Sequence, residues 1–171
     1  MYRLGNRLVG AVASAALVMG AAAALARATP PSGAPRVGRA QKVDAGGARL
    51  SVTVLKLVNI PSSAGASLLP GFRAVGVEVE IASTGPAIYD SSGTADFSIV
   101  ATLSNATVAN VTSVYIPAGI CKTQLRDFDN YITAGEYRSG CVAFAIPAKA
   151  RVSDVRFSPH GKSRGRLTWR V

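Results

Sequence analysis

Residues 72–81 read FRAVGVEVEI, and this stretch has the clearest periodicity in the chain. Val75, Val77, Val79 and Ile81 alternate with small or acidic residues. In an extended chain, this alternation places the apolar side chains on one face and the polar ones on the other. The stretch therefore predicts a β-strand that packs one face against a core.

Similar runs lie on both sides of this stretch, and Pro-, Gly- and Ser-rich turn signals separate them. In the last run, Trp169 is predicted to face inward, and the run 141–146, which is apolar on both faces, is predicted to be a central strand. One or two helical turns are expected within 122–131. Together the pattern predicts an all-β fold, a single antiparallel β-sandwich of about seven to eight strands, with a closed barrel as second choice. The runs are 50–54, 72–81, 97–103, 108–116, 141–146, 152–158 and 167–171.

The N-terminus has the layout of a bacterial secretory signal peptide over residues 1–28. Arg3 and Arg7 precede an apolar run at 8–25, and small residues follow at a spacing suited to cleavage. This layout predicts a secreted protein or one held in the cell envelope. The alternative is an uncleaved anchor, because the run is near the lower length limit of a membrane-spanning helix. Contact with a membrane is expected only in that case.

Residues 29–47 read TPPSGAPRVGRAQKVDAGG. Proline and glycine are frequent here and large apolar side chains are scarce, which predicts a flexible linker. The β-sandwich domain is expected to occupy residues 48–171.

The chain carries 19 Lys and Arg against 9 Asp and Glu, a formal net charge of +10. An exported basic surface can contact lipid head groups, wall polymers or acidic glycans, or another surface protein, whereas nucleic acid is not an expected partner. The plainer interpretation is that the charges keep a small β protein soluble. The excess is concentrated near the C-terminus, and the predicted anion-binding residues are Arg156, Lys162, Arg164, Arg166 and Arg170.

Cys121 and Cys141 are the two cysteines of the chain. An even count in an exported protein predicts a disulfide, which here would close a loop of about 20 residues and stabilise the fold by about 3 kcal/mol. Two free buried thiols and a metal pair are the alternatives, but the spacing fits no zinc pattern.

No residue pattern predicts a catalytic site. His160 is the sole histidine and lies in an expected turn, Pro159-His160-Gly161, with no marked nucleophile beside it. Glu78 and Glu80 share one face of a predicted strand, which is typical of a solvent-facing surface rather than of a catalytic pair across a cleft. We expect no enzyme activity and no cofactor.

The loop Asp127–Asn130 is the best oxygen cluster, but it lacks the glycine and the closing glutamate of a calcium loop. We expect no metal site, and calcium at this loop stays open. Tyr131 and Tyr137 are candidates for an exposed aromatic patch.

Several blocks of sequence resemble a bacterial family of exported immunoglobulin-like domains of unknown function. The mycobacterial secreted immunogenic β-sandwich proteins are similar in architecture. The resemblance covers residues 48–171 and implies an immunoglobulin-like sandwich without established catalytic residues. The blocks are FRAVGVEVEI at 72–81, DFSIV at 96–100, GCVAFAIP at 140–147, RFSP at 156–159 and LTW at 167–169.

These observations together predict an exported, non-catalytic binding or structural domain at the cell surface or in the medium. Its basic C-terminal face would contact an anionic polymer. The alternative function is a secreted enzyme whose site the sequence does not mark.

Overall fold

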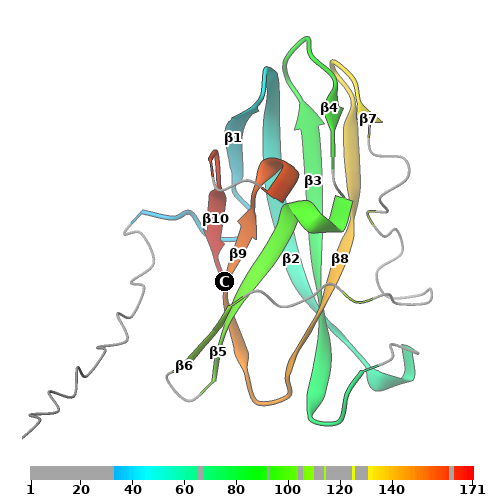
Figure 1. Ribbon diagram of the computed structural model, residues 1–171, viewed down its shortest axis with the longest axis vertical. Coiled ribbons are helices and arrows are strands. Elements are labelled where there is room, and N and C mark those ends of the chain that lie inside the picture. Colours follow the sequence, from blue (N-terminus) through cyan, green and yellow to red (C-terminus); the bar gives the residue numbers. More distant parts are fainter. Residues whose placement is uncertain are drawn as a thin grey trace, which may run out of the picture. The chain divides into compact units, whose positions relative to one another are not determined.

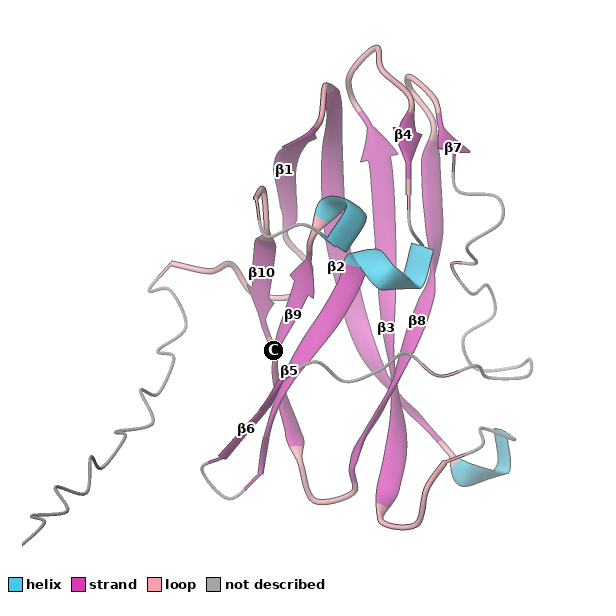
Figure 2. Cartoon of the chain, in the orientation of Figure 1, coloured by secondary structure: helices cyan, strands magenta, loops and turns pink. Residues whose placement is uncertain are grey.

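The described part of the chain forms ten β-strands and three short 3-10 helices (Figure 1, Figure 2). The computed structural model describes residues 33–64, 68–91, 93–103, 106–109, 114, 125, 131–161 and 164–171. The strands are β1 Ala40–Ala45, β2 Ala48–Ile60, β3 Phe72–Ser83, β4 Tyr89–Asp90, β5 Phe97–Leu103, β6 Ala106–Ala109, β7 Tyr131–Ile132, β8 Tyr137–Pro147, β9 Arg151–Phe157 and β10 Leu167–Arg170. The 3-10 helices are η1 Ser62–Ala64, η2 Gly93–Asp96 and η3 Pro159–Gly161.

The strands form two four-stranded sheets and one short pair. The first sheet has the order β1-β2-β3-β8, the second has the order β10-β9-β5-β6, and β4 pairs with β7. All these pairings are antiparallel. The chain passes from the first sheet to the second between β3 and β5, and again between β8 and β9. The prediction of an all-β, antiparallel fold is confirmed.

One hydrophobic core lies between the two sheets. In β3, Val77, Val79 and Ile81 are fully buried, as the alternation in FRAVGVEVEI predicts. Because the inward residues of both sheets belong to a single cluster, the arrangement is that of a sandwich. Trp169 faces this core, as predicted. The second sheet contributes Phe97, Ile99, Ala101, Val155, Phe157 and Trp169.

Among the described strands β8 is the last of its sheet, whereas its sequence predicts a central strand. Its outer edge accepts backbone hydrogen bonds from the N–H groups of Val114, at 2.9 Å, and Leu125, at 3.3 Å. Both faces of β8 are nevertheless apolar because Val142, Phe144 and Ile146 face the main core, while Cys141 and Ala143 join a second, smaller cluster.

Residues 33–47 are part of the β domain, so the predicted linker is wrong for this segment. β1 pairs with β2 along its whole length, from Ala40 opposite Thr53 to Ala45 opposite Ala48. Just before β1, Arg36 forms a parallel bridge with Arg170 of the second sheet. The segment therefore contacts both sheets at one edge. Proline and glycine content misled the prediction because the segment is held mainly through backbone groups.

Some smaller elements were not predicted, and some predicted elements lie outside the described residues. β1, β4 and β7 have no counterpart among the predicted strands. The predicted strand 108–116 lies largely outside the described residues, as do the expected helical turns and the signal peptide. Within the described part of the chain, no helix has the length and apolar character needed to cross a membrane.

Candidate functional site

Three arginines surround one threonine on the outer face of the β9–β10 ladder. Arg156 of β9 lies opposite Thr168 of β10. Arg166 and Arg170 are two residues away from Thr168 on either side, so all three share its face. Such diagonal neighbours in antiparallel strands are separated by about 7–8 Å, within reach of long side chains. We call Arg156, Arg166 and Arg170 the arginine ladder.

Both ends of the arginine ladder have polar neighbours. Arg166 Nε donates a hydrogen bond of 3.3 Å to the hydroxyl of Ser158. Asp154, opposite Arg170, is the carboxylate nearest in register, and it is buried, with a hydrogen bond of 2.8 Å from Ser153 Oγ.

Two ion pairs join side chains on other parts of the described surface. Lys56 Nζ pairs with Glu78 at 3.4 Å on the first sheet, and Arg138 pairs with Glu136 at 3.6 Å at the start of β8. Because the side chains of Lys56 and Glu78 are both partly exposed, this pair lies on the solvent-facing side of β3, as the sequence predicts for Glu78.

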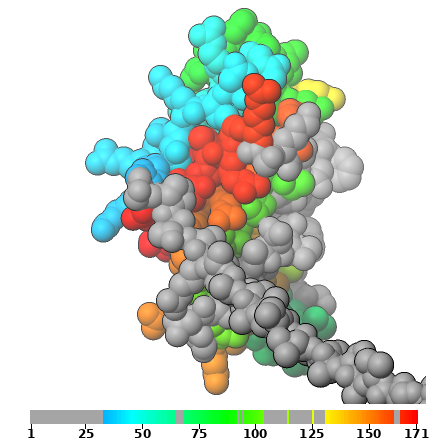
Figure 3. All heavy atoms as spheres, turned by 60° about the vertical axis from the view of Figure 1, so that its left-hand side comes forward, coloured from blue at the N-terminus to red at the C-terminus, as the bar shows by residue number. Residues whose placement is uncertain are grey.

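The N-terminal segment adds a further arginine to this edge. Arg36 is exposed and bridges Arg170, whose backbone N–H donates to Pro35 O at 2.9 Å and whose carbonyl accepts from Val37 N–H at 3.0 Å. In Figure 3, the N-terminal residues in blue and the C-terminal residues in red meet at the surface. Sequence reasoning missed Arg36 because it assigned the segment to a linker.

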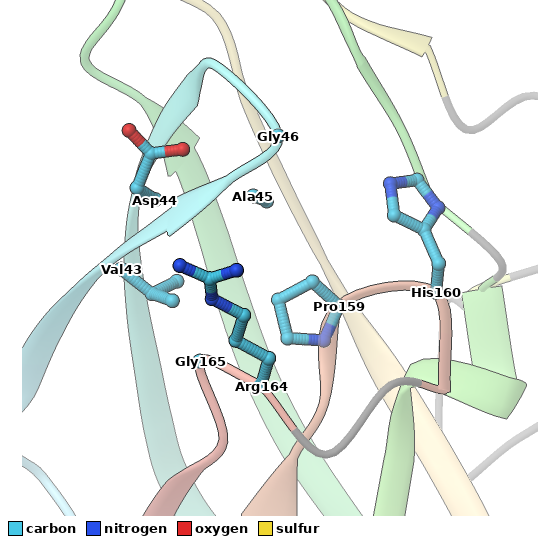
Figure 4. Close-up of a pocket in the computed structure, with 8 residues that line it drawn as sticks. All are labelled: Val43, Asp44, Ala45, Gly46, Pro159, His160, Arg164 and Gly165. Atoms are coloured by element: carbon cyan, nitrogen blue, oxygen red, sulfur yellow. The ribbon is translucent and has the colours of Figure 1, made fainter.

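The remaining predicted basic residues do not belong to the ladder. Lys162 lies outside the described residues. Arg164 is exposed in the β9–β10 connection and faces a cavity of about 590 Å³ (Figure 4). We call this the turn cavity. It lies between two segments of the chain. The end of β1 and the β1–β2 turn contribute Val43 to Gly46, and the β9–β10 connection contributes Pro159, His160, Arg164 and Gly165.

His160 has a left-handed backbone, with φ 51° and ψ 32°. This conformation is costly for residues other than glycine, by about 1–2 kcal/mol. Its ring packs against Tyr89, with centroids 5.1 Å apart. The turn predicted at this histidine is therefore confirmed, but its conformation and its aromatic neighbour were not predictable from the sequence.

Below His160 lies a buried polar network. Tyr89 donates from its hydroxyl to Asp96 Oδ2 at 2.7 Å, and Ser91 Oγ donates to the same oxygen at 2.9 Å. Asp96 is 1% exposed. Burial raises the pKa of Tyr89 far above its usual range, and the adjacent Asp96 carboxylate raises it further. The phenol of Tyr89 therefore stays protonated. Its ring, fixed by the hydrogen bond to Asp96, packs against the ring of His160.

The other residues singled out in the sequence are not joined to this region by any described contact. Tyr131 and Tyr137 are each 63% exposed, which confirms that these two side chains are at the surface. Cys141 is buried in β8, whereas Cys121 and the loop Asp127–Asn130 lie outside the described residues. Within the described ranges, no group of three or more His, Cys, Asp or Glu side chains could hold a metal ion. The disulfide and the calcium question stay predictions.

The fold is similar to that of a solved structure described as "a putative lipoprotein (ycdA) from Bacillus subtilis subsp. subtilis str. 168". The TM-score is 0.51, the sequence identity is 13%, and the match covers 77% of this chain and 38% of that one. This chain thus spans well under half the length of the Bacillus protein. A second structure, "a putative lipoprotein from Staphylococcus aureus subsp. aureus NCTC 8325", has a TM-score of 0.47 and 9% identity over 77% of this chain and 93% of that one.

No protein-family model matches the chain, and no curated protein matches it either. The structural likeness shows a β-rich fold that also occurs in a protein described as a putative lipoprotein. Membership in the immunoglobulin-like family stays a prediction.

Proposed function

We propose that the chain is an exported, non-catalytic domain of the cell envelope that binds an anionic wall polymer through the arginine ladder. The observation that carries this proposal is the placement of Arg156, Arg166 and Arg170 around Thr168 on one outer face. Guanidinium groups present paired donors that suit phosphate and carboxylate groups. A row of such groups along adjacent strands suits repeated anionic charges better than a single small ligand.

Two further observations support export and the immunoglobulin-like fold. The signal-like residues 1–28 and the description of the Bacillus neighbour as a putative lipoprotein both favour an envelope location. In the sheets, β2, β3 and β8 follow the order of immunoglobulin strands A, B and E, while β5, β9 and β10 follow that of C, F and G.

The test compares two double variants with equal loss of charge. Arg156→Gln with Arg166→Gln removes two members of the ladder. Lys149→Gln with Arg151→Gln removes two exposed charges at the β8–β9 connection and serves as the control. Binding to an oligo(glycerol phosphate) is measured by calorimetry from about 50 to 300 mM salt, a range over which screening increases strongly.

We expect the ladder variant to bind about tenfold or more weakly, the scale of one lost charge-assisted hydrogen bond. The control variant should bind like the wild type, and affinity should fall as salt rises. Equal weakening of the two variants would mean that net charge alone attracts the polymer. Wild-type binding by the ladder variant would overturn the proposal.

A further inference from the structure

The turn cavity is too large for a single inorganic anion. Its volume of about 590 Å³ is in the range of small-molecule sites, about 300–1,000 Å³. Val43, Ala45 and Pro159 line the cavity (Figure 4), and their side chains can supply apolar contact for the body of a ligand. The cavity therefore suits a molecule about the size of a sugar ring or larger.

The polar groups around the turn cavity have two kinds of chemistry. Arg164 and His160 can donate to an anionic group. Arg164 belongs to neither ion pair of the described residues. On the β1 side, one Asp44 oxygen accepts the Gly47 N–H at 2.8 Å. The carboxylate keeps acceptor capacity for hydroxyl donors of a ligand.

The strain at His160 is a second, independent observation. Glycine or asparagine would adopt its left-handed backbone at lower cost. The ring is instead held in place by Tyr89, which is itself fixed by its hydrogen bond to Asp96. A strained residue supported by a buried network is a pre-organised group, and such strain is concentrated at functional sites.

We propose that the turn cavity binds an anionic sugar unit, one that carries a carboxylate or a phosphate. Arg164 and His160 bind the anionic group, Asp44 accepts a sugar hydroxyl, and Pro159 contacts the ring. This inference rests on the proposed function in one respect, because the unit would be part of the polymer bound by the arginine ladder. The inference narrows the polymer of the proposed function to one that contains anionic sugar units.

The imidazole of His160 gives a direct readout, because it is the sole histidine of the chain. Its ring signals are followed by NMR while glucuronate, glucose 1-phosphate, glucose or inorganic phosphate is added. The two anionic sugars should shift the signals in a saturable manner. Glucose should not, and inorganic phosphate should act only at much higher concentration. Equal effects of phosphate and glucose 1-phosphate would overturn the role of the sugar, and the absence of any saturable shift would overturn the site.

Two variants test the residues, with affinity for glucuronate measured by calorimetry. Arg164→Gln removes the guanidinium from an exposed side chain, and His160→Asn removes the imidazole but tolerates the left-handed backbone. Each should weaken binding about tenfold, whereas Arg151→Gln, which removes an arginine at the far end of β9, should not. Unchanged affinity in both site variants would overturn the assignment. The wild-type NMR titration decides the matter should either variant fail to fold.

The two proposals can fail separately. Sugar units that bind while neither oligo(glycerol phosphate) nor an oligomer of glucuronate binds would leave the turn cavity standing and overturn the polymer function. Polymer binding without any response at His160 would leave the ladder standing and overturn the cavity.

Discussion

Trp169 and Arg39 are joined by a hydrogen bond of 2.6 Å, from the indole Nε1–H to the backbone carbonyl oxygen. The indole is fully buried in the core of the sandwich. Its polar atom therefore depends on the N-terminal segment for a partner. The segment before β1 completes the fold at the edge where the two sheets meet.

A chain that begins at Ala40 should be less stable than one that begins at Gly33. The shorter chain loses the partner of Trp169 and the backbone bonds that Pro35, Val37 and Gly38 make with the sheets. Each of these four bonds contributes about 0.5–1.5 kcal/mol net, so we expect a loss of about 2–6 kcal/mol in the free energy of unfolding. Urea unfolding followed by circular dichroism measures it. Equal midpoints for the two chains would show that the segment is dispensable.

Gly165→Ala should destabilise the fold more than Gly135→Ala. Both glycines have a positive φ, +77° and +79°, so alanine pays a similar backbone cost at each. At Gly165 an added Cβ would also approach Val43 Cγ2 at 3.0 Å, whereas at Gly135 it would meet no atom within 4 Å. Overpacking of this kind costs about 1–3 kcal/mol. Equal melting temperatures would contradict the close contact between β1 and the β9–β10 connection.

The stability of the protein should fall above about pH 10 through Tyr89. Burial raises the pKa of Tyr89 in the folded state, so this tyrosine loses its proton in the unfolded chain first. Its contribution is fully present below the unfolded pKa and decreases at higher pH by up to about 1.4 kcal/mol per pH unit.

Tyr89→Phe should make this alkaline decline shallower, although it lowers stability near neutral pH by removing the hydrogen bond to Asp96. Tyr137→Phe is the control, because Tyr137 is 63% exposed. Urea unfolding at several pH values from 7 to about 11.5 gives the slopes. Parallel slopes for the wild type and Tyr89→Phe would contradict the burial of an un-ionised phenol.

Oxidised protein should have no alkylatable thiol and should be about 2 Da lighter than its reduced form. Reduction should lower the free energy of unfolding by about 3 kcal/mol, and it should have no effect on a variant in which Cys121 and Cys141 are both Ser. Intact mass with and without reductant, together with urea unfolding, measures both effects. Alkylation of the unreduced protein would argue against the disulfide.

The strands that were predictable from the sequence are those with one buried face and one face exposed to solvent. In β3, Val77, Val79 and Ile81 alternate with other residues because every second side chain points into the core. Trp169 in β10 faces the core in the same way. Alternation fails at β1, whose residues are mostly half-buried or exposed and which is held by backbone pairing to β2. Backbone hydrogen bonds leave little trace in residue type.

The candidate site was predictable only in part, for a related reason. The arginines of β9 and β10 are close in sequence, and a strand period of two places Arg166 and Arg170 on one face. The turn cavity joins Asp44 to His160 and Arg164, more than a hundred residues apart in the chain, across two sheets. Only tertiary structure brings such residues together.

The pairing of residues 35–37 with Arg170 has a consequence for self-association. An uncovered edge strand offers its free N–H and C=O groups as a template on which another chain can add a strand. The bonds of Pro35 and Val37 to the backbone of Arg170 occupy these groups at the end of β10, and Gln41 Nε2 occupies the carbonyl of Thr168. The same few residues that complete the sandwich therefore guard this edge against β-sheet polymerisation.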